Sequence, residues 1–507
     1  MWWDDRNCAR ASTWPGRRRG LRLGAGLVLG AGLPWAFAST RPAPGAPALA
    51  RPSVGESLLR GCGLPGANVG AYARALDSDT PLVSLNPEKP FQLASTTKLV
   101  TAMAALDLLG PHFRWRTMAF TRGTLLRGRL LGDLWIVGGG NAYLRTQDLQ
   151  VWMAEWRKLG LREIIGDIVL DRFAFQLTEH DHENTPVPAA DRPHHMWPDA
   201  LTLDEGRLKV RLNPSRDGRP EVQLEPPLAG VRIEPSRLGG SGCTAWAQWS
   251  DTPRDAEPLI RVQGSLGPRC GSREWVLAPL PHAEFTTRAI AGLWRQSGGQ
   301  LHGRVIDKSH PDRRSLIPEG ADGEPQLPFA THISPPLPQL LREINKTSDN
   351  LAARNLMLAL SRGFPHRPAT LPAAQARMRE WLTKQGLGPG DIEIENGSGL
   401  SRAEKAKPRA FVDLLAKAWH ARQAAALIDS LPVAGVDGTL EHRMTRGAAT
   451  GQAHLKTGTL LDTRALAGYV KARSGKVYAV TALVNHPEAA RATPSLDAFI
   501  EWLARAN

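Results

Sequence analysis

Residues from about 113 to 280 have a different sequence pattern from the two segments that flank them. Short alternating runs such as RLKVRLNP and PLIRVQGSLG are separated there by Gly and Pro, which is typical of strands and turns. The flanking segments mix apolar helix-forming stretches with strand candidates. A chain of 507 residues is also too long for one ordinary domain. We therefore expect an α+β fold, an antiparallel sheet with helices, that is interrupted by a β-rich insertion of one or two small domains.

Strand candidates occur near both ends of the chain. Val69 to Leu76 and Leu82 to Leu85 have the pattern of a hairpin. The stretch LVTAMAALDLL, which follows Lys98, combines apolar spacing with good helix formers and predicts a buried helix. Further helices are predicted in TTRAIAGLWRQSG, PPLPQLLREINKTSDNLAARNLMLALSRG, AAQARMREWLTKQG, AFVDLLAKAWHARQ and SLDAFIEWLARAN, and further strands at Ala453–Thr459, Thr463–Val470 and Lys476–Val484.

The N-terminus has the three parts of a secretory signal. Four arginines between positions 17 and 22 precede an apolar run, Leu23 to Phe37, that is too short to span a bilayer as an ordinary helix. Ala36-Phe37-Ala38 is a small-x-small site and predicts cleavage after Ala38. The alternative is an uncleaved anchor, and both the Sec and the twin-arginine routes remain open. We expect export without a stable transmembrane anchor, because no later segment approaches 18 unbroken apolar residues.

The chain is strongly basic, with 63 Lys and Arg against 49 Asp and Glu and a net charge of +14. The arginines are scattered, and neither basic clusters beside aromatic platforms nor a zinc pattern occurs. A nucleic-acid-binding protein is therefore not favoured. We interpret the charge as a basic solvated surface that meets an anionic environment through general electrostatics.

Export permits disulfides, and three of the four cysteines follow the predicted cleavage site. Cys243 and Cys270 lie in similar Gly-flanked turns and are predicted to pair. Cys62 is then left over, and we expect it to be a buried free thiol. None of the three has zinc-ligand spacing with the 14 His, so no metal site is predicted.

Three short motifs carry hydroxyl, amide and ammonium groups. Ser95-Thr-Thr-Lys98 places a hydroxyl and an ammonium three residues apart, on one face of a helix. Ser348-Asp349-Asn350 lies in a turn flanked by helices. Lys456-Thr457-Gly458, followed by Thr459, begins within a strand candidate, where a Gly leaves room for a substrate backbone along the strand.

Each motif has a simpler interpretation when it is taken alone. A Ser-x-x-Lys occurs by chance about once in a chain of this size, and it could be a helix cap with a surface Lys. The second motif could be an Asx turn, and the third a strand end with an exposed Lys. The three occur in one order after an export signal, and this combination favours a site with a nucleophilic serine.

The three motifs match the active-site set of the penicillin-recognising serine acyltransferases. From about Gly55 to the C-terminus, the chain more closely resembles the class C low-molecular-mass penicillin-binding proteins, which are D-alanyl-D-alanine carboxypeptidases and endopeptidases. Ser95 and Ser348 lie 253 residues apart. This spacing is similar to that in class C, whose members carry accessory domains inserted into a transpeptidase-like domain. One departure is GGGNAYL (138–144), where the family usually has Asp-Pro after the glycines. Family-like stretches are LGPHFRWRT (109–117), GRLLGDLWIVGGG (128–140), GDIVLDRFAF (166–175), SPPL (334–337), INKTSDNLAARNL (344–356), NGSGLSR (396–402), LPVAGVDGTL (431–440) and LKTGTLLDTRALAGYV (455–470).

The resemblance implies a serine-type D-Ala-D-Ala carboxypeptidase, with DD-endopeptidase activity as an additional expectation. Such an enzyme cleaves peptidoglycan stem peptides through an acyl-enzyme and binds β-lactam antibiotics covalently. Ser95 is the expected nucleophile. Lys98 is the expected general base, and desolvation beside the cationic Lys456 would favour the neutral amine that this role requires. Ser348 would relay a proton to the leaving amine, while Asn350 would orient Lys98 and the substrate.

The third motif is expected to bind the substrate. Lys456 and Thr457 suit a carboxylate, Gly458 lies beside the substrate strand, and the N–H groups of Ser95 and Thr459 would form the oxyanion hole. No step requires a metal or a cofactor. The resemblance also implies a periplasmic location and allows a homodimer, although no apolar stripe indicates one. The expected organisation is a signal peptide at 1–38, a Pro- and Ala-rich tether at 39–54, a transpeptidase-like catalytic domain at 55–112 and 281–507, and the β-rich insertion at 113–280.

Two other functions use similar residues. A serine β-lactamase has the same three motifs but hydrolyses its acyl-enzyme quickly through a positioned water, and the sequence has no additional Glu motif that would activate that water. A non-catalytic peptidoglycan-binding relative would be expected to lack one of the reactive groups, and here every hydroxyl, amide and ammonium is present. The peptidase is therefore the favoured interpretation.

Overall fold

The computed structural model describes residues 53–183, 195–215, 221–235, 242–250, 258–308, 317 and 324–506, and their fold is α+β, as predicted. The predicted signal peptide and nearly all of the predicted tether lie outside the described residues. Helix α1 (Val54–Arg60) begins inside the segment predicted as a tether, because the Ser53 side chain caps it by accepting a hydrogen bond from the N–H of Glu56 at 3.2 Å. Within the described part of the chain, no helix combines the length and apolarity needed to cross a membrane.

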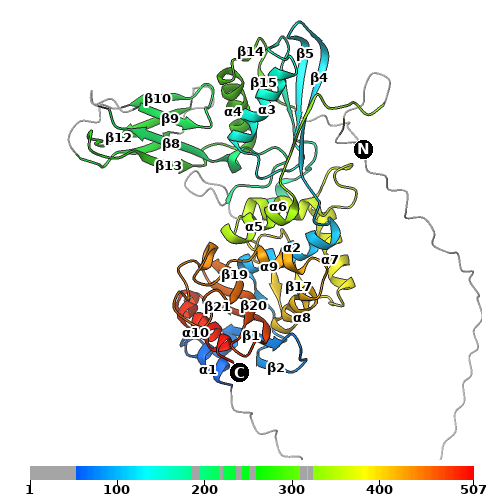
Figure 1. Ribbon diagram of the computed structural model, residues 1–507, viewed down its shortest axis with the longest axis vertical. Coiled ribbons are helices and arrows are strands. Elements are labelled where there is room, and N and C mark those ends of the chain that lie inside the picture. Colours follow the sequence, from blue (N-terminus) through cyan, green and yellow to red (C-terminus); the bar gives the residue numbers. More distant parts are fainter. Residues whose placement is uncertain are drawn as a thin grey trace, which may run out of the picture. The chain divides into compact units, whose positions relative to one another are not determined.

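The two ends of the described chain share one antiparallel sheet, in the strand order β19-β20-β21-β1-β2 (Figure 1). Strand β1 pairs with β21, so that Ala71 lies opposite Ala482. The predicted hairpin and the predicted C-terminal strands are confirmed, with bounds that differ by one residue. The strands are β1 (Val69–Ala75), β2 (Pro81–Leu85), β19 (Ala453–Leu460), β20 (Thr463–Lys471) and β21 (Val477–Asn485).

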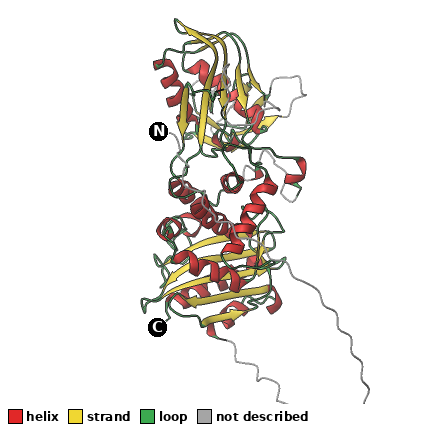
Figure 2. Cartoon of the chain, turned by 90° about the vertical axis from the view of Figure 1, so that its right-hand side faces the viewer, coloured by secondary structure: helices red, strands yellow, loops and turns green. Residues whose placement is uncertain are grey.

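Alternate residues of β20 contribute to two hydrophobic cores, one on each face of this sheet. Ala465, Ala467 and Tyr469 belong to a core that includes the larger group of helices, whereas Leu466 and Val470 belong to a core that includes α1 and α10 (Thr493–Ala504). Figure 2 shows the helices packed over the sheet. The larger group comprises α2 (Thr97–Leu108), α5 (Leu337–Thr347), α6 (Asn350–Ala359), α7 (Leu371–Lys384), α8 (Pro408–Trp419) and α9 (Ala424–Asp429). A small sheet beside it has the order β17 (Ile392–Glu393), β18 (Lys405–Ala406) and β3 (Phe91–Gln92).

A second large sheet lies within the inserted region. Strands β4 and β5 form its long hairpin, and helices α3 and α4 cover it with the buried side chains of Trp152, Trp156 and Trp294. The predicted end of the insertion at residue 280 is wrong, because α4 and the three strands that follow it belong to this sheet and its core. A helical pattern predicts a helix but does not indicate which sheet the helix covers. The elements are β4 (Arg116–Leu126), β5 (Arg129–Val137), α3 (Thr146–Lys158), β6 (Glu163–Ile164), β7 (Ile168–Asp171), α4 (His282–Gln296), β14 (Gln300–Leu301), β15 (Val305–Asp307) and β16 (Ala330–Ile333).

Two three-stranded sheets complete the described part of the inserted region, with the orders β13-β8-β9 and β10-β12-β11. The predicted disulfide between Cys243 and Cys270 is present and lies in this part of the chain. Cys62 is buried and free, as predicted. The strands are β8 (Leu208–Asn213), β9 (Glu221–Glu225), β10 (Arg232–Pro235), β11 (Trp246–Ser250), β12 (Leu259–Gln263) and β13 (Arg273–Leu277).

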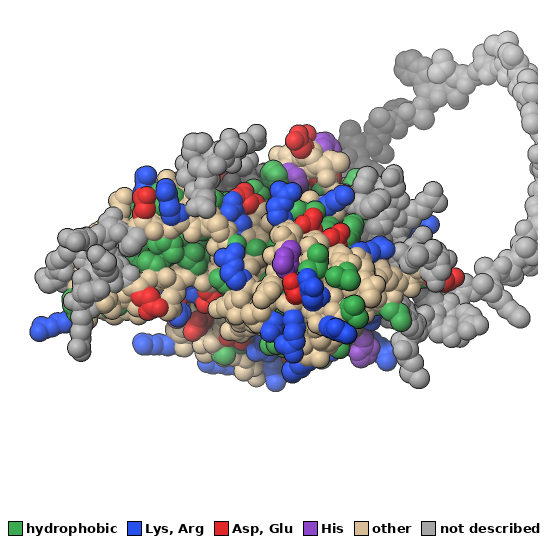
Figure 3. Space-filling view, turned by 90° about the horizontal axis from the view of Figure 1, so that it is seen from above, with side chains coloured by type: hydrophobic (Ala, Val, Ile, Leu, Met, Phe, Trp, Pro, Cys, Tyr) green, Lys and Arg blue, Asp and Glu red, His purple; other side chains and the backbone are tan. Residues whose placement is uncertain are grey.

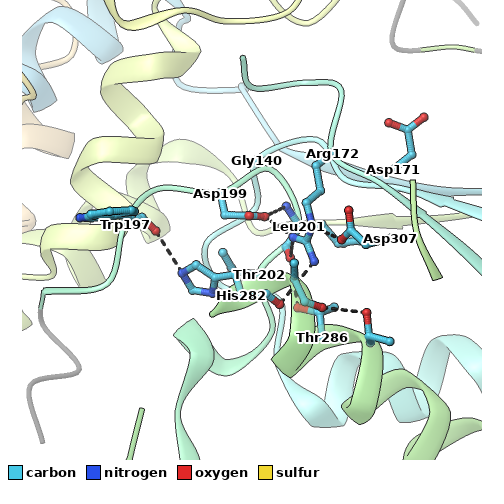
Figure 4. A network of polar contacts seen from close by, with 12 residues as sticks. Gly140, Asp171, Arg172, Trp197, Asp199, Leu201, Thr202, His282, Thr286 and Asp307 are labelled. Atoms are coloured by element: carbon cyan, nitrogen blue, oxygen red, sulfur yellow. Dashed lines mark hydrogen bonds and ion pairs between the residues drawn. The ribbon is translucent and has the colours of Figure 1, made fainter. Parts of the chain in front are cut away.

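The inserted region is bonded to helix α6. Within the inserted region, a polar network surrounds Arg172 (Figure 4). The Arg172 guanidinium forms ion pairs with Asp199 and Asp307, so it fixes the loop that contains Asp199. The side-chain amide of Asn355, in α6, donates to the backbone carbonyls of Asp199 and Gly140, each at 3.0 Å. Both acceptors belong to the inserted region. The network therefore sets the position of the helix that begins at Asn350.

Basic side chains occur at many separate positions on the surface. Figure 3 shows Lys and Arg side chains spread over one face, with Asp and Glu side chains between them. Several described arginines have acidic partners, such as Arg211 with Glu274 at 2.9 Å and Arg288 with Glu284 at 2.9 Å. Part of the positive charge is therefore balanced locally.

Candidate active site

The first motif forms a tight turn and the start of a buried helix. Ser95 is in a 3-10 turn, η2 (Ala94–Thr96), and is half-buried, whereas Lys98 is in the first turn of α2 and is fully buried. The Nζ atom of Lys98 lies 3.1 Å from Ser95 Oγ, 2.6 Å from Asn350 Oδ1 and 2.6 Å from the carbonyl oxygen of Ser398. Three segments that are far apart in the sequence thus converge on one amine.

The surroundings of Lys98 favour its neutral form. Burial lowers the pKa of Lys98 from its ordinary value of 10.5 to about 7, and the Asp349 and Glu404 carboxylates oppose this shift. A neutral amine has two N–H groups and one lone pair. The amide of Asn350 and the carbonyl of Ser398 can accept the two N–H groups, which leaves the lone pair for the hydroxyl of Ser95.

The second motif joins two helices. Ser348 ends α5 in the left-handed conformation, with φ of 60°, and Asp349 caps α6 by accepting from the N–H of Ala352 at 3.0 Å. Asn350 is therefore the first residue of α6, and its side chain is held against Lys98. This is the helix-flanked turn that the sequence predicted.

The third motif lies on β19, which is an edge strand of the five-stranded sheet. Lys456 is fully buried, and its Nζ donates to Ser348 Oγ at 2.8 Å. Burial lowers the pKa of Lys456 well below its ordinary value, and the nearby Lys98 lowers it further. The Thr457 hydroxyl bonds to the Thr439 hydroxyl at 2.8 Å, and Thr459 is exposed.

The structure gives a reason for the glycine at position 458 that the sequence did not reveal. A Cβ atom at this position would lie 2.7 Å from the carbonyl oxygen of Leu93 and 3.1 Å from the Cβ of Ala94. The turn that carries Ser95 can therefore pack against β19 only because residue 458 lacks a side chain. A cavity of about 380 Å³ borders β19 on Thr457, Gly458 and Thr459.

Sequence patterns missed several residues of this site. Ser398 contributes only a backbone carbonyl, and Thr439 only a hydroxyl, so neither has a residue type that signals its role. Tyr143, in the stretch that departs from the family, is partly buried near Asp349 and Glu205, and desolvation and these carboxylates raise its pKa well above its ordinary value. The sequence pointed to these residues only through the stretches NGSGLSR, LPVAGVDGTL and GGGNAYL, which contain them. These stretches did not indicate a role for any individual residue.

Contacts thus join the three predicted motifs: Lys98 bonds to Ser95 and Asn350, Lys456 bonds to Ser348, and Gly458 packs against the turn of Ser95. A family model described as the D-Ala-D-Ala carboxypeptidase 3 (S13) family matches residues 53–506. The chain belongs to this family.

Similar proteins come from several bacteria. The chain is 27% identical over 435 residues to the D-alanyl-D-alanine carboxypeptidase DacB of Haemophilus influenzae, with 83% of this chain and 86% of the relative covered. It is 28% identical over 439 residues to the D-alanyl-D-alanine carboxypeptidase of Actinomadura, with 83% and 78% covered. The crystal structure of penicillin binding protein 4 from Haemophilus influenzae has a similar fold, with a TM-score of 0.68, 24% identity, and 89% of this chain and 99% of that chain covered.

Proposed function

We propose that this D-Ala-D-Ala carboxypeptidase forms its acyl-enzyme on Ser95 and removes the terminal D-Ala of peptidoglycan stem peptides. The observation that supports this assignment is the position of Lys98, whose buried amine lies 3.1 Å from Ser95 Oγ. Its pKa of about 7 leaves a large neutral fraction near neutral pH. A neutral amine at hydrogen-bond distance from a serine hydroxyl is the arrangement that general-base activation requires.

In the proposed acylation step, Lys98 accepts the proton of Ser95, and Oγ attacks the carbonyl carbon of the penultimate D-Ala. The N–H groups of Ser95 and Thr459 stabilise the tetrahedral oxyanion. The C–N bond then breaks, and the proton reaches the departing D-Ala amine through Ser348. Water later hydrolyses the ester and regenerates Ser95.

The remaining groups bind and orient the substrate. Asn350 accepts from Lys98 at 2.6 Å, and its NH₂ group would donate to the carbonyl oxygen of the substrate amide. Lys456 and Thr457 bind the terminal carboxylate, with a charge-assisted hydrogen bond from Lys456. The same site would cleave a D-Ala–diaminopimelate cross-link and would be acylated by β-lactams, because both present an amide carbonyl near a carboxylate.

The test is intact-mass spectrometry of the protein after incubation with benzylpenicillin, with proteolysis to locate the adduct. We expect a stable adduct on Ser95, no adduct in Ser95→Ala, and D-Ala release from a stem-peptide substrate by the wild type only. Ser361→Ala is the matched control, because it removes another buried hydroxyl, which donates to the carbonyl of Thr370. This variant should still acquire the benzylpenicillin adduct on Ser95. An adduct elsewhere would overturn the assignment, and one that clears within seconds would favour the β-lactamase.

The cellular setting is part of the proposal. The N-terminal pattern of Arg residues, an apolar run and Ala36-Phe37-Ala38 supports export to the periplasm, where peptidoglycan is the substrate. N-terminal sequencing of the secreted protein should begin at Ser39. Sedimentation at several concentrations tests for the homodimer that the family resemblance allows.

A further inference from the structure

A buried carboxylate behind the site binds four backbone N–H groups of one loop. Glu404 has no exposed surface. One of its oxygens accepts from the N–H groups of Glu395, Asn396 and Gly397 at 3.2, 2.9 and 2.7 Å, and the other accepts from Gly399 at 2.6 Å. Both oxygens face donors, an arrangement that suits an ionised carboxylate and not a protonated one.

The loop held by Glu404, residues 395–399, contacts both proposed reacting groups. The carbonyl of Ser398 accepts from Lys98 Nζ at 2.6 Å. Gly399 has φ of 91°, and a Cβ there would lie 2.0 Å from the carbonyl oxygen of Ala94 and 2.6 Å from the backbone N of Ser95. The backbone of Gly399 therefore packs directly against the peptide bond that precedes the proposed nucleophile.

The backbone of Glu404 is attached to the same turn. Its carbonyl accepts from the N–H of Leu93 at 3.1 Å, and the Leu93 carbonyl in turn accepts from the N–H of Thr96 at 3.2 Å and from its hydroxyl at 2.7 Å. Glu404 thus contacts the turn of Ser95 through its backbone and the loop beside Lys98 through its side chain. Thr101, on α2, holds the loop from another side by donating to the Gly397 carbonyl at 2.7 Å.

We propose that Glu404 is a positioning residue for the acylation step, which holds loop 395–399 so that Ser95 and Lys98 keep their reactive geometry. The inference rests on the proposed function, because it takes Ser95 as the nucleophile and Lys98 as the base. Glu404 itself does not contact the substrate or the reacting atoms. Its effect is transmitted through the Ser398 carbonyl and the Gly399 backbone.

The Glu404 charge also bears on Lys98. The charged groups around this amine are the carboxylates of Asp349 and Glu404, the amine of Lys456 on β19, and Arg354, an α6 guanidinium that interacts with Glu404. Glu404 raises the pKa of Lys98 against the larger effect of burial. Removing its charge should therefore lower that pKa, so that Lys98 becomes neutral at a lower pH.

The experiment measures the second-order rate constant for acylation by benzylpenicillin between pH 5 and 9, using only the protein fraction that acquires a Ser95 adduct. For Glu404→Gln we expect the plateau that this rate constant reaches at high pH to fall about 10²-fold, as for a small misplacement of reacting groups. We also expect the midpoint of the pH profile to lie below that of the wild type. Glu393→Gln is the control, because this exposed carboxylate accepts one N–H, from Gly390 at 2.9 Å, and both quantities should stay unchanged.

A second variant separates the effect of the Glu404 charge from the effect of its side-chain length. Glu404→Asp keeps the charge but is shorter by one methylene, so the plateau should fall while the midpoint stays at the wild-type pH. This variant also provides the test if Glu404→Gln does not fold. The inference is overturned if both variants retain the wild-type plateau and midpoint, or if they only reduce the fraction of protein that labels. A wild-type protein that labels on a residue other than Ser95 would instead overturn the proposed function.

Discussion

The amine of Lys456 donates a 2.8 Å hydrogen bond to the hydroxyl of Ser348, although the two residues are 108 positions apart. This contact joins the edge strand β19 to the turn between α5 and α6. Burial and the nearby Lys98 lower the pKa of Lys456, whereas a substrate carboxylate beside it would favour the charged amine. The proposed carboxylate anchor and the proposed proton relay are therefore directly bonded, so substrate binding and leaving-group protonation share one contact.

Lys456→Ala should slow acylation by carboxylate-bearing substrates by about 30-fold or more, which corresponds to about 2 kcal/mol for a charge-assisted hydrogen bond. Substrates with an ester in place of the carboxylate should lose much less. Stopped-flow acylation with both substrate types measures this difference, and Lys476→Ala, at an exposed position, is the control. Equal losses on both substrate types would contradict the anchoring role.

The acylation rate should depend on pH through Lys98. The pKa of this amine is lowered to about 7, and only the neutral form accepts the Ser95 proton. The rate should therefore rise with pH, by about tenfold per unit well below the pKa, and level off above about pH 8. A pH series of acylation rates tests this. A flat profile between pH 5 and 8 would show that Lys98 is not the base.

Gly458→Ala should impair both stability and acylation. The added methyl group would meet the Leu93 carbonyl at 2.7 Å and push the Ser95 turn away from β19. Overpacking of this kind costs about 1–3 kcal/mol of unfolding free energy, which chemical denaturation measures. Gly271→Ala is the control, because no atom lies within 4 Å of its added Cβ. If Gly458→Ala acylates at the wild-type rate, the packing of the turn is not required for catalysis.

Removing the disulfide should destabilise the inserted region but leave the active site intact. The bond joins residues 27 positions apart, and a loop of this length contributes about 3.5 kcal/mol in the chain-entropy model. The double variant Cys243→Ser, Cys270→Ser should unfold at lower temperature and still label on Ser95 in native buffer. A reducing agent should lower the melting temperature of the wild type and not that of the variant. Loss of labelling in the folded variant would contradict this separation.

Periodicity and residue type predicted much of the fold. The bounds of the strands in the five-stranded sheet were predicted to within one residue. The end of the insertion was predicted too early, because the helical pattern of α4 was assigned to the flanking segment, whereas α4 packs on the inserted sheet and β14–β16 pair within it. Which sheet an element joins depends on contacts between distant residues, and no local pattern records these contacts.

The site shows the same limit. Ser95, Lys98 and Lys456 were singled out because reactive side chains occur in spaced motifs. Ser398 and Glu404 were not singled out. Ser398 acts through its backbone carbonyl, and Glu404 binds backbone N–H groups out of contact with the solvent. Groups that position a reactive side chain through the main chain can be of almost any residue type. They become visible only when the distances are known.

The order of the strands in the sheet has a consequence for the timing of activity. Ribosomes add β1 and the Ser95 turn early. They add β19, which carries Lys456, and β21, the central strand that pairs with β1, more than 350 residues later, shortly before α10. A nascent or prematurely terminated chain therefore has the proposed nucleophile without the strand that supports it and without the proposed carboxylate anchor. We therefore expect partial products that end before β19 to be inert toward peptidoglycan.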